Sequence, residues 1–262
     1  MARASRRESG GSPAPGREGR RICLEIAGIS IEVSAEDPGM SLRVQGAAEK
    51  FLTRTARPDV RIRAGWSDRF AEPRGEMLFD SGSLWKLYNE DGSLRFRFHS
   101  TRFAGAPYKV ASFAPDFATG EVQLNRQLLD ARLPADPLEY PLDELLVVNL
   151  LAQDRGVEVH ACGLVTPQGN GYLFLGQSGA GKTTMAHLWL KEPGVTILND
   201  DRIVLRLMGD EVRMYACAFL PFHSRQGLDY SLGMFGEVAS RVPCHELGFI
   251  PDRSIVGYVL RS

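Results

Sequence analysis

The sequence predicts an α/β fold with a β-rich module first and a domain with a mixed sheet second. Three observations support this prediction. Apolar and polar residues alternate in several short runs between residues 22 and 130, as in half-buried strands. Apolar residues at helical spacing follow over residues 141–156. A glycine-rich loop then stands between an apolar run and a second helical pattern.

Residues 1–21 are expected to form a disordered basic tail. They are rich in Arg, Ser, Gly and Pro and contain almost no apolar side chains, so burial could not offset the entropy lost on ordering. Contact with an acidic partner or RNA is an alternative use of the arginines. The stretch also lacks the apolar segment of a secretion signal.

Composition narrows the class of protein further. The chain has 262 residues and a formal net charge of −1, which gives no reason to expect nucleic acid or a membrane as a partner. The four cysteines show no CxxC spacing and are expected to be reduced thiols in a cytoplasmic protein. A homo-oligomer is compatible with the sequence.

Residues 22–140 are expected to form the β-rich module. Strands are predicted in "ICLEIAGISIEVS", "DVRIRAGW", "YKVASFA" and "GEVQLNRQL". The run "SLWKLYNEDGSLRFRFHS" predicts a hairpin that turns at Asp91-Gly92. His99 and the aromatic residues of this module are interpreted as packing residues, because no catalytic cluster surrounds them.

The second domain is expected over residues 141–262. It opens with a helix in "YPLDELLVVNLLAQDRG", which has Asp143 and Glu144 in its first turn, where the helix dipole favours negative charge. Asn170-Gly171 predicts a hairpin between "VEVHACGLV" and "YLFL". A turn centred there would put His160 opposite about residue 181, beside the glycine loop.

The string "GQSGAGKTT" (176–184) matches the phosphate-loop pattern GxxxxGK[ST]. An apolar strand precedes it and a helix from Lys182 to about Lys191 follows, which is the context that this motif requires. We therefore expect ATP to bind here, with Lys182 on the β- and γ-phosphates and the Thr183 hydroxyl on Mg²⁺. The residues expected to contact the nucleotide are Gly176, Gln177, Ser178, Gly179, Ala180, Gly181, Lys182, Thr183 and Thr184.

Two aspartates, Asp200 and Asp201, follow a short apolar strand over residues 195–198. Acidic residues at the C-terminal end of a strand lie where α/β sheets hold their ligands. Only one helix and one strand separate the pair from the loop, so we expect two roles at one site: one carboxylate near the metal and one near an incoming hydroxyl. The alternative is a polar turn, because "NDDR" has the composition of a β-turn.

Together these segments resemble the catalytic core of the HPr kinase/phosphorylase family. The resemblance rests on "VHACGLV", "GNGYLFLGQSGAGKTTMAHLW" and "VTILNDDRIVL". It implies a P-loop within a phosphoenolpyruvate-carboxykinase-like sheet and catalytic roles for His160, Lys182 and Asp200. Asp200 would handle the proton of the acceptor hydroxyl, and Asp201 would lie near the histidine and the metal. Thr184 stands where the family has a glutamate, so the chain resembles a divergent member of the kind found in peptide-modification cassettes.

The expected function is therefore ATP- and Mg²⁺-dependent transfer of the γ-phosphoryl group to a hydroxyl, with serine expected, of a protein or peptide. One alternative is a P-loop ATPase or a nucleotide-binding regulatory module without a phosphoacceptor. A second is a non-catalytic adaptor that keeps ATP for structure. The second aspartate with His160 nearby favours the kinase, because a plain ATPase needs no such pair.

Overall fold

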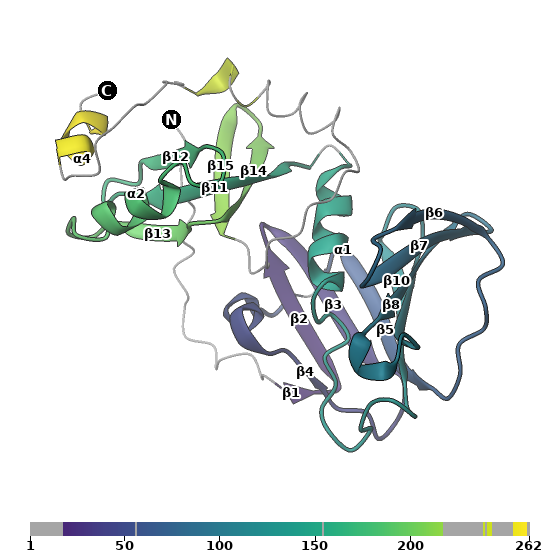
Figure 1. Ribbon diagram of the computed structural model, residues 1–262. Helices are drawn as coiled ribbons and strands as arrows, with labels where there is room; N and C mark the ends of the chain where they lie inside the picture. The colour runs from purple at the N-terminus through teal and green to yellow at the C-terminus, as the bar shows by residue number, and fades with distance from the viewer. Residues whose placement is uncertain are drawn as a thin grey trace. The chain divides into compact units, whose positions relative to one another are not determined.

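The computed structural model describes residues 18–55, 57–153, 155–216, 238, 240–242 and 254–260. The chain is a mixed α/β protein built mostly of strands, as the sequence predicts (Figure 1). It divides into two compact units, and the division follows Leu146. We call residues 18–146 the N-terminal module and residues 147–260 the C-terminal module.

The described part of the N-terminal module contains an eight-stranded sheet with the order β2-β3-β5-β10-β9-β8-β7-β6. β5 runs parallel to both of its neighbours, β3 and β10, and the other pairs are antiparallel. The strands of this sheet are β2 (Arg21–Ile26), β3 (Ile29–Ala35), β5 (Val60–Ser67), β6 (Glu76–Asp80), β7 (Trp85–Glu90), β8 (Ser93–His99), β9 (Pro107–Phe113) and β10 (Thr119–Asn125). The remaining elements are the strand pair β1 (Glu18–Gly19) and β4 (Leu42–Arg43) and the 3₁₀ helices η1 (Gly46–Phe51) and η2 (Thr101–Phe103).

The strands predicted in this module are confirmed, and two tight turns show why they pair. β7 and β8 are joined by Asp91 and Gly92, which have φ values of 50° and 84°. Ala27 and Gly28 join β2 and β3 and also have positive φ. Such turns match the twist of the strands that they connect, and Asp-Gly is a preferred sequence for them.

Alternate side chains of these strands form the core of the module. Trp85, Phe96, Phe98 and Phe113 are buried, and the rings of Phe96 and Phe113 meet edge to face with centroids 6.2 Å apart. His99 lies at the end of β8 with its Nδ1 2.8 Å from the carbonyl oxygen of Gly105. This contact agrees with the interpretation of His99 as a packing residue.

The start of the sheet differs from the prediction of a tail that reaches residue 21. Glu18–Gly19 forms β1, and Arg21 begins β2. The guanidinium of Arg20 donates hydrogen bonds to three backbone carbonyl oxygens, those of Ala35, Asp37 and Pro38. These hydrogen bonds join residues distant in sequence and fix residues 18–21 in place, although composition alone assigns them to a tail. The earlier part of the predicted tail, residues 1–17, lies outside the described residues.

Helix α1 (Leu142–Leu151) confirms the helical pattern expected over residues 141–156, although it ends earlier. Asp143 and Glu144 stand in its first turn, as expected from the helix dipole. The division between the two modules falls within this helix.

The C-terminal module is built around strand β11, which pairs with β12 along one edge and with β13 and β14 along the other. β15 pairs with β14. Every pairing described in this sheet is antiparallel, so the prediction of a mixed sheet is wrong for these strands. The reason is that β11 lies between β12 and β13 and runs opposite to both. The elements are β11 (Val157–Val165), β12 (Gly171–Leu175), α2 (Lys182–Trp189), β13 (Thr196–Asn199), β14 (Arg202–Met208), β15 (Glu211–Ala216) and α4 (Ser254–Val259).

The two faces of this sheet have different partners. Ala161 of β11 packs with Ile203 of β14 in a core on one face. Leu164 of β11 packs on the other face with Trp189 of α2 and Ile255 of α4. Because side chains alternate along a strand, the even-numbered positions of β11, including residues 158 and 160, lie on the face that α2 covers.

The hairpin between β11 and β12 is confirmed, but its turn is not centred on Asn170-Gly171. The Gly169 N–H donates to the Thr166 carbonyl oxygen and the Thr166 N–H to the Asn170 carbonyl oxygen, both at 2.9 Å. Gly169 takes the positive φ of 85° that the turn requires. The register pairs Ala161 with Leu175, so its next step sets His160 opposite Gly176, rather than opposite residue 181.

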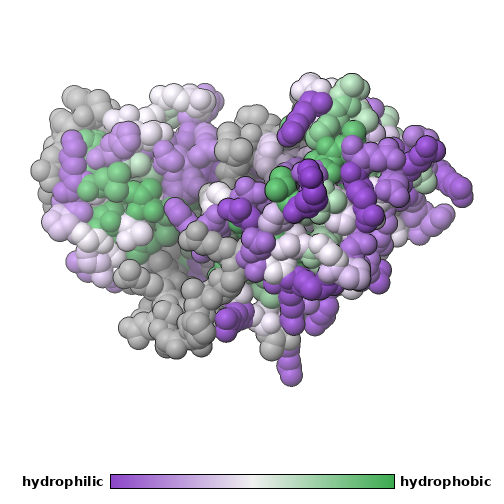
Figure 2. Space-filling model, turned by 90° about the horizontal axis from the view of Figure 1, so that it is seen from below, coloured by the Kyte–Doolittle hydropathy of each residue, from purple (hydrophilic) through white to green (hydrophobic). Residues whose placement is uncertain are grey.

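Two general properties follow from the described residues. None of their helices is both long and apolar enough to span a membrane. Cys23 and Cys162 are free thiols, and the other two cysteines lie outside the described part of the chain. In Figure 2, hydrophilic side chains cover much of the coloured surface, and hydrophobic residues form smaller groups between them.

Candidate functional site

The glycine-rich loop connects β12 to α2 and has a backbone that only small residues allow. Gly179 and Gly181 have φ values of 84° and 91°, in the region that favours glycine. A Cβ on Gly176 would come within 2.8 Å of the Ala180 Cβ. Residues 176–180 are exposed, so the loop presents its backbone to solvent at the point where α2 begins.

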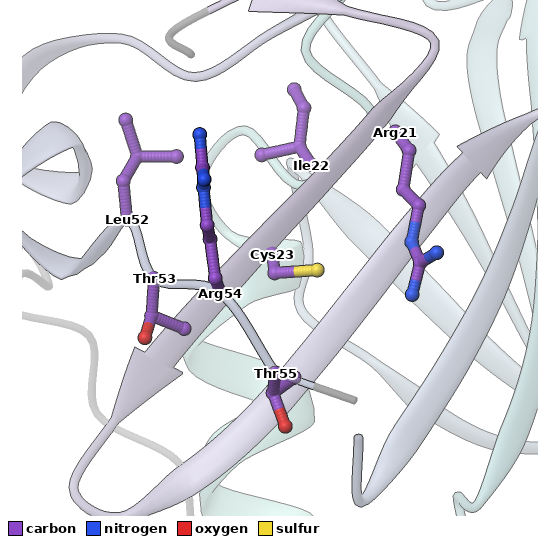
Figure 3. A pocket seen from close by; sticks show the side chains of 7 residues that line it. All are labelled: Arg21, Ile22, Cys23, Leu52, Thr53, Arg54 and Thr55. Carbon is purple, nitrogen blue, oxygen red and sulfur yellow. The ribbon is translucent and has the colours of Figure 1, made fainter. Parts of the chain in front are cut away.

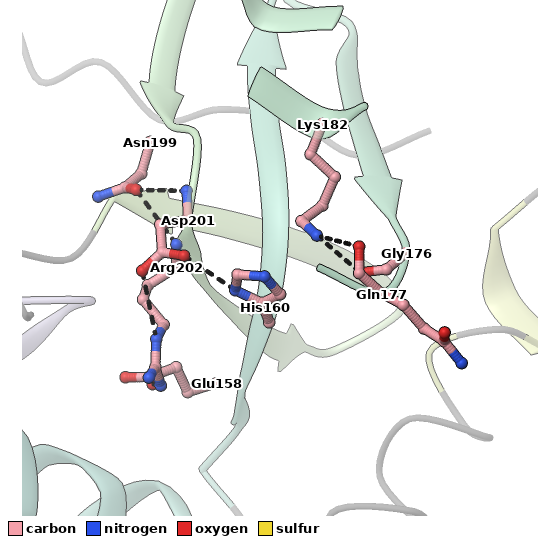
Figure 4. Close-up of polar contacts among 8 residues, drawn as sticks. All are labelled: Glu158, His160, Gly176, Gln177, Lys182, Asn199, Asp201 and Arg202. Atoms are coloured by element: carbon pink, nitrogen blue, oxygen red, sulfur yellow. Dashed lines mark hydrogen bonds and ion pairs between the residues drawn. The ribbon is translucent and has the colours of Figure 1, made fainter. Parts of the chain in front are cut away.

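Lys182, the first residue of α2, folds back across this loop. Its Nζ donates hydrogen bonds to the carbonyl oxygens of Gly176, at 2.7 Å, and Gln177, at 2.9 Å (Figure 4). The residue as a whole is 8% exposed. The loop thus surrounds an ammonium group, and Thr183 and Thr184 are exposed beside it in the first turn of the helix. This arrangement fits a phosphate group, because it combines a cation, a helix N-terminus and glycine backbone.

The two aspartates follow β13 in a turn that Asn199 organises. The Asn199 side-chain oxygen accepts hydrogen bonds from the backbone N–H groups of Asp201, at 2.8 Å, and Arg202, at 3.1 Å. The Asp201 carbonyl oxygen accepts a hydrogen bond from Ala161 N at 3.0 Å. The polar turn that we considered as an alternative is therefore present, and the same turn carries both carboxylates to the edge of β11.

His160 of β11 and Asp201 of the turn between β13 and β14 form a contact. His160 Nδ1 lies 2.9 Å from Asp201 Oδ1, and both side chains are partly exposed, at 42% and 36% (Figure 4). A carboxylate oxygen offers only lone pairs, so this contact is favourable when Nδ1 carries a proton. In Figure 4 the loop contacts of Lys182 lie on one side of His160 and the Asp201 contacts on the other, which agrees with the register that sets His160 opposite Gly176.

A buried ion pair stands beside this contact. Arg202 Nη1 donates to Glu158 Oε1, and the two side chains are only 10% and 7% exposed. Burial raises the pKa of Glu158, and the charge of Arg202 opposes this rise. Arg202 Nε also lies 3.7 Å from Asp201 Oδ2. A row of interacting polar side chains therefore runs from Glu158 through Arg202 and Asp201 to His160.

Asp200 is exposed, and its charge acts on Cys162 of β11. Burial raises the pKa of the Cys162 thiol to about 11, and the Asp200 carboxylate contributes to the rise. Since Cys162 and His160 are two positions apart on β11, they share a face of the strand. Asp200 is thus brought toward the same strand as Asp201.

The described residues contain no group of three or more His, Cys, Asp or Glu side chains that could hold a metal ion. Magnesium is usually held by one or two protein ligands together with substrate phosphates and water. The Thr183 hydroxyl and the Asp201 carboxylate, which sequence reasoning selected, could serve in that way.

A pocket in the N-terminal module is lined by residues 21–23 of β2 and residues 52–55 (Figure 3). It opens next to the bridge between Leu24 and Leu52. The residues predicted for the functional site all belong to the other module, so this pocket adds nothing to that site.

Sequence reasoning did not select Glu158 and Arg202. A signal was present for each: Glu158 precedes His160 by two positions and so shares its strand face, and Arg202 directly follows the aspartates. Their contact joins positions far apart in the sequence, which a local pattern does not reveal.

No family model matches the chain, and no curated protein matches it significantly.

Proposed function

We propose that the C-terminal module is a P-loop kinase domain of the phosphoenolpyruvate-carboxykinase-like type, similar to HPr kinases. It would transfer the γ-phosphoryl group of ATP to a hydroxyl, with serine expected, of a protein or peptide. The observation that carries the proposal is the His160–Asp201 contact, 2.9 Å long, beside the glycine loop. Hydrolysis alone would require an oriented water but not a histidine–aspartate pair.

The proposed roles follow from the chemistry of each side chain. The Lys182 ammonium and the loop N–H groups would bind the β- and γ-phosphates. Thr183 and Asp201 would hold magnesium, which when bound neutralises charge on the phosphate oxygens. Asp200 would orient the acceptor hydroxyl and accept its proton. The acceptor oxygen then forms a bond to phosphorus while the bond from phosphorus to the leaving diphosphate oxygen breaks.

Asp200→Asn tests the proposal, because it keeps the shape of the side chain and removes its charge and basicity. We expect ATP affinity to stay within a few-fold and transfer to fall by about 10²- to 10⁴-fold, the usual contribution of a positioned acid–base group. The measurement pairs calorimetric titration of ATP with transfer of labelled phosphate to a library of serine-containing peptides. Asp210→Asn, an exposed aspartate in the turn after β14, is the matched control and should change neither quantity.

Two results would contradict the proposed function. Release of free phosphate at the same rate with and without any peptide would indicate an ATPase. An equal loss of ATP binding and transfer in Asp200→Asn would make Asp200 a metal ligand and not the group that acts on the acceptor.

A further inference from the structure

Arg202 interacts more closely with Glu158 than with Asp201, and this difference points to a role for Glu158. Arg202 lies between two carboxylates, those of Glu158 and Asp201. It is hydrogen bonded to Glu158 through Nη1, whereas its Nε is 3.7 Å from Asp201 Oδ2, too far for a hydrogen bond.

Burial explains why Arg202 favours Glu158. The Glu158 side chain is 7% exposed, while that of Asp201 is 36% exposed. Attraction between opposite charges is stronger where water is excluded and weaker where solvent screens it. The arginine is therefore held on the buried side, and the Asp201 carboxylate remains available to His160.

The geometry of the strands keeps this arrangement in place. His160 and Arg202 are paired residues of β11 and β14, and Glu158 is paired with Val204 on the same two strands. Glu158, His160 and Arg202 thus occupy neighbouring positions on one face of the sheet. Asn199 fixes the backbone that carries both Asp201 and Arg202.

We propose that Glu158 is a positioning residue. By holding Arg202 in the buried ion pair, it keeps the guanidinium at 3.7 Å from Asp201 Oδ2, too far for a hydrogen bond, and so leaves Asp201 Oδ1 to fix the His160 imidazole with its proton on Nδ1. The Nε2 atom then carries the lone pair. The part of this inference that concerns turnover rests on the proposed kinase function; the part that concerns the tautomer does not.

Glu158→Gln tests the inference, because it removes the charge that holds Arg202 while keeping the size of the side chain. Arg202 should then move to Asp201 and compete with His160. The tautomer can be measured on the full chain by two-bond ¹H–¹⁵N correlation of ¹⁵N-labelled histidine at pH 8. The chain has five histidines, and comparison with His160→Gln identifies the signals of His160.

In the wild type we expect the Nδ1–H tautomer to dominate at His160. In Glu158→Gln the Nε2–H tautomer should appear in comparable amount, and phosphoryl transfer should fall about ten- to hundredfold, the usual effect of losing a group that orients a ligand or catalytic residue. ATP affinity should stay within about twofold, since the polar contact described for Glu158 is with Arg202 of β14 and not with a loop residue. Glu211→Gln, which breaks the partly exposed Arg213–Glu211 pair of β15, is the matched control and should change none of these quantities.

The double variant Glu158→Gln/Arg202→Met separates positioning from general damage. It removes the competing guanidinium, so the Nδ1–H tautomer should return, although one more residue has been changed. It also leaves no buried charge unpaired. A variant that merely loosened the fold would not recover in this way.

The inference is overturned if Glu158→Gln keeps the wild-type tautomer, or if the double variant fails to restore it. Should Glu158→Gln not fold, Glu158→Asp replaces it: its shorter side chain keeps the charge and should give an intermediate population, and a wild-type population would refute the proposal. If the wild type shows no phosphoryl transfer at all, the proposed function fails while the tautomer measurement still decides the role of Glu158.

Discussion

Replacing Asp143 with asparagine should make the protein more stable at neutral pH and leave its stability nearly unchanged at pH 4. Asp143 stands in the first turn of α1, where its Oδ1 accepts a hydrogen bond from Glu144 N at 2.8 Å. It belongs to a group of charges around Lys109, which is fully buried and donates from Nζ to the Glu139 carbonyl oxygen at 2.9 Å. Burial raises the pKa of Asp143 to about 6, although the Glu144 N–H and the charge of Lys109 oppose the rise.

The sign of the effect follows from proton binding. Between pH 4 and about 6 the folded protein keeps a proton on Asp143 that the unfolded chain has lost, so the free energy of unfolding falls as pH rises through this window. The rise in pKa from 3.8 to about 6 corresponds to at most about 3 kcal/mol lost above pH 6. Asparagine keeps an oxygen for the Glu144 N–H and has no charge to bury, so the variant should avoid this loss.

The assay is urea denaturation of both proteins between pH 4 and 7.5, followed by tryptophan fluorescence. The difference in free energy of unfolding should grow from near zero at pH 4 to as much as about 3 kcal/mol at pH 7. Asp130→Asn is the control. Arg132 lowers the pKa of this exposed carboxyl from its ordinary value of 3.8 to about 2. The contribution of Asp130 to the free energy of unfolding is therefore lost only as pH falls from 3.8 to about 2, below the range of the assay. Parallel pH curves for wild type and Asp143→Asn would refute the reasoning, and a less stable variant at pH 7 would mean that attraction to Lys109 exceeds the effect of burial.

Two further predictions concern the C-terminal module. Lys182→Ala should weaken ATP binding at least tenfold, about 1.4 kcal/mol, because phosphate charge would lose its ammonium partner in the loop; unchanged affinity in calorimetry would reject the phosphate-binding role of the loop. Gly163→Ala should lower the free energy of unfolding by about 1–3 kcal/mol, because the new Cβ would lie 2.5 Å from Cδ1 of the buried Ile203. An unchanged midpoint in thermal denaturation would show that the Ile203 side chain can move aside without loss.

Several features of the fold and the site could be predicted because they depend on neighbouring residues in the chain. The turn at Asp91-Gly92 needs two consecutive residues with positive φ, and the sequence supplies a suitable pair. The glycine loop is likewise local: the spacing of its glycines allows the backbone geometry, and Lys182 reaches the loop carbonyls from the first residue of α2. Helix α1 and most strands follow from the periodicity of their apolar residues.

The tertiary structure decided the features that depend on residues distant in sequence. Insertion of β11 between β12 and β13 made the described sheet antiparallel, because a strand's own pattern specifies its faces but not its neighbours. The shift of the hairpin turn to Gly169 set His160 opposite Gly176 and not opposite residue 181. The Glu158–Arg202 ion pair depends on the pairing of β11 with β14 and on burial of both side chains. The sequence thus determined which side chains are available for chemistry, whereas strand order and register determined which of them come within reach of one another.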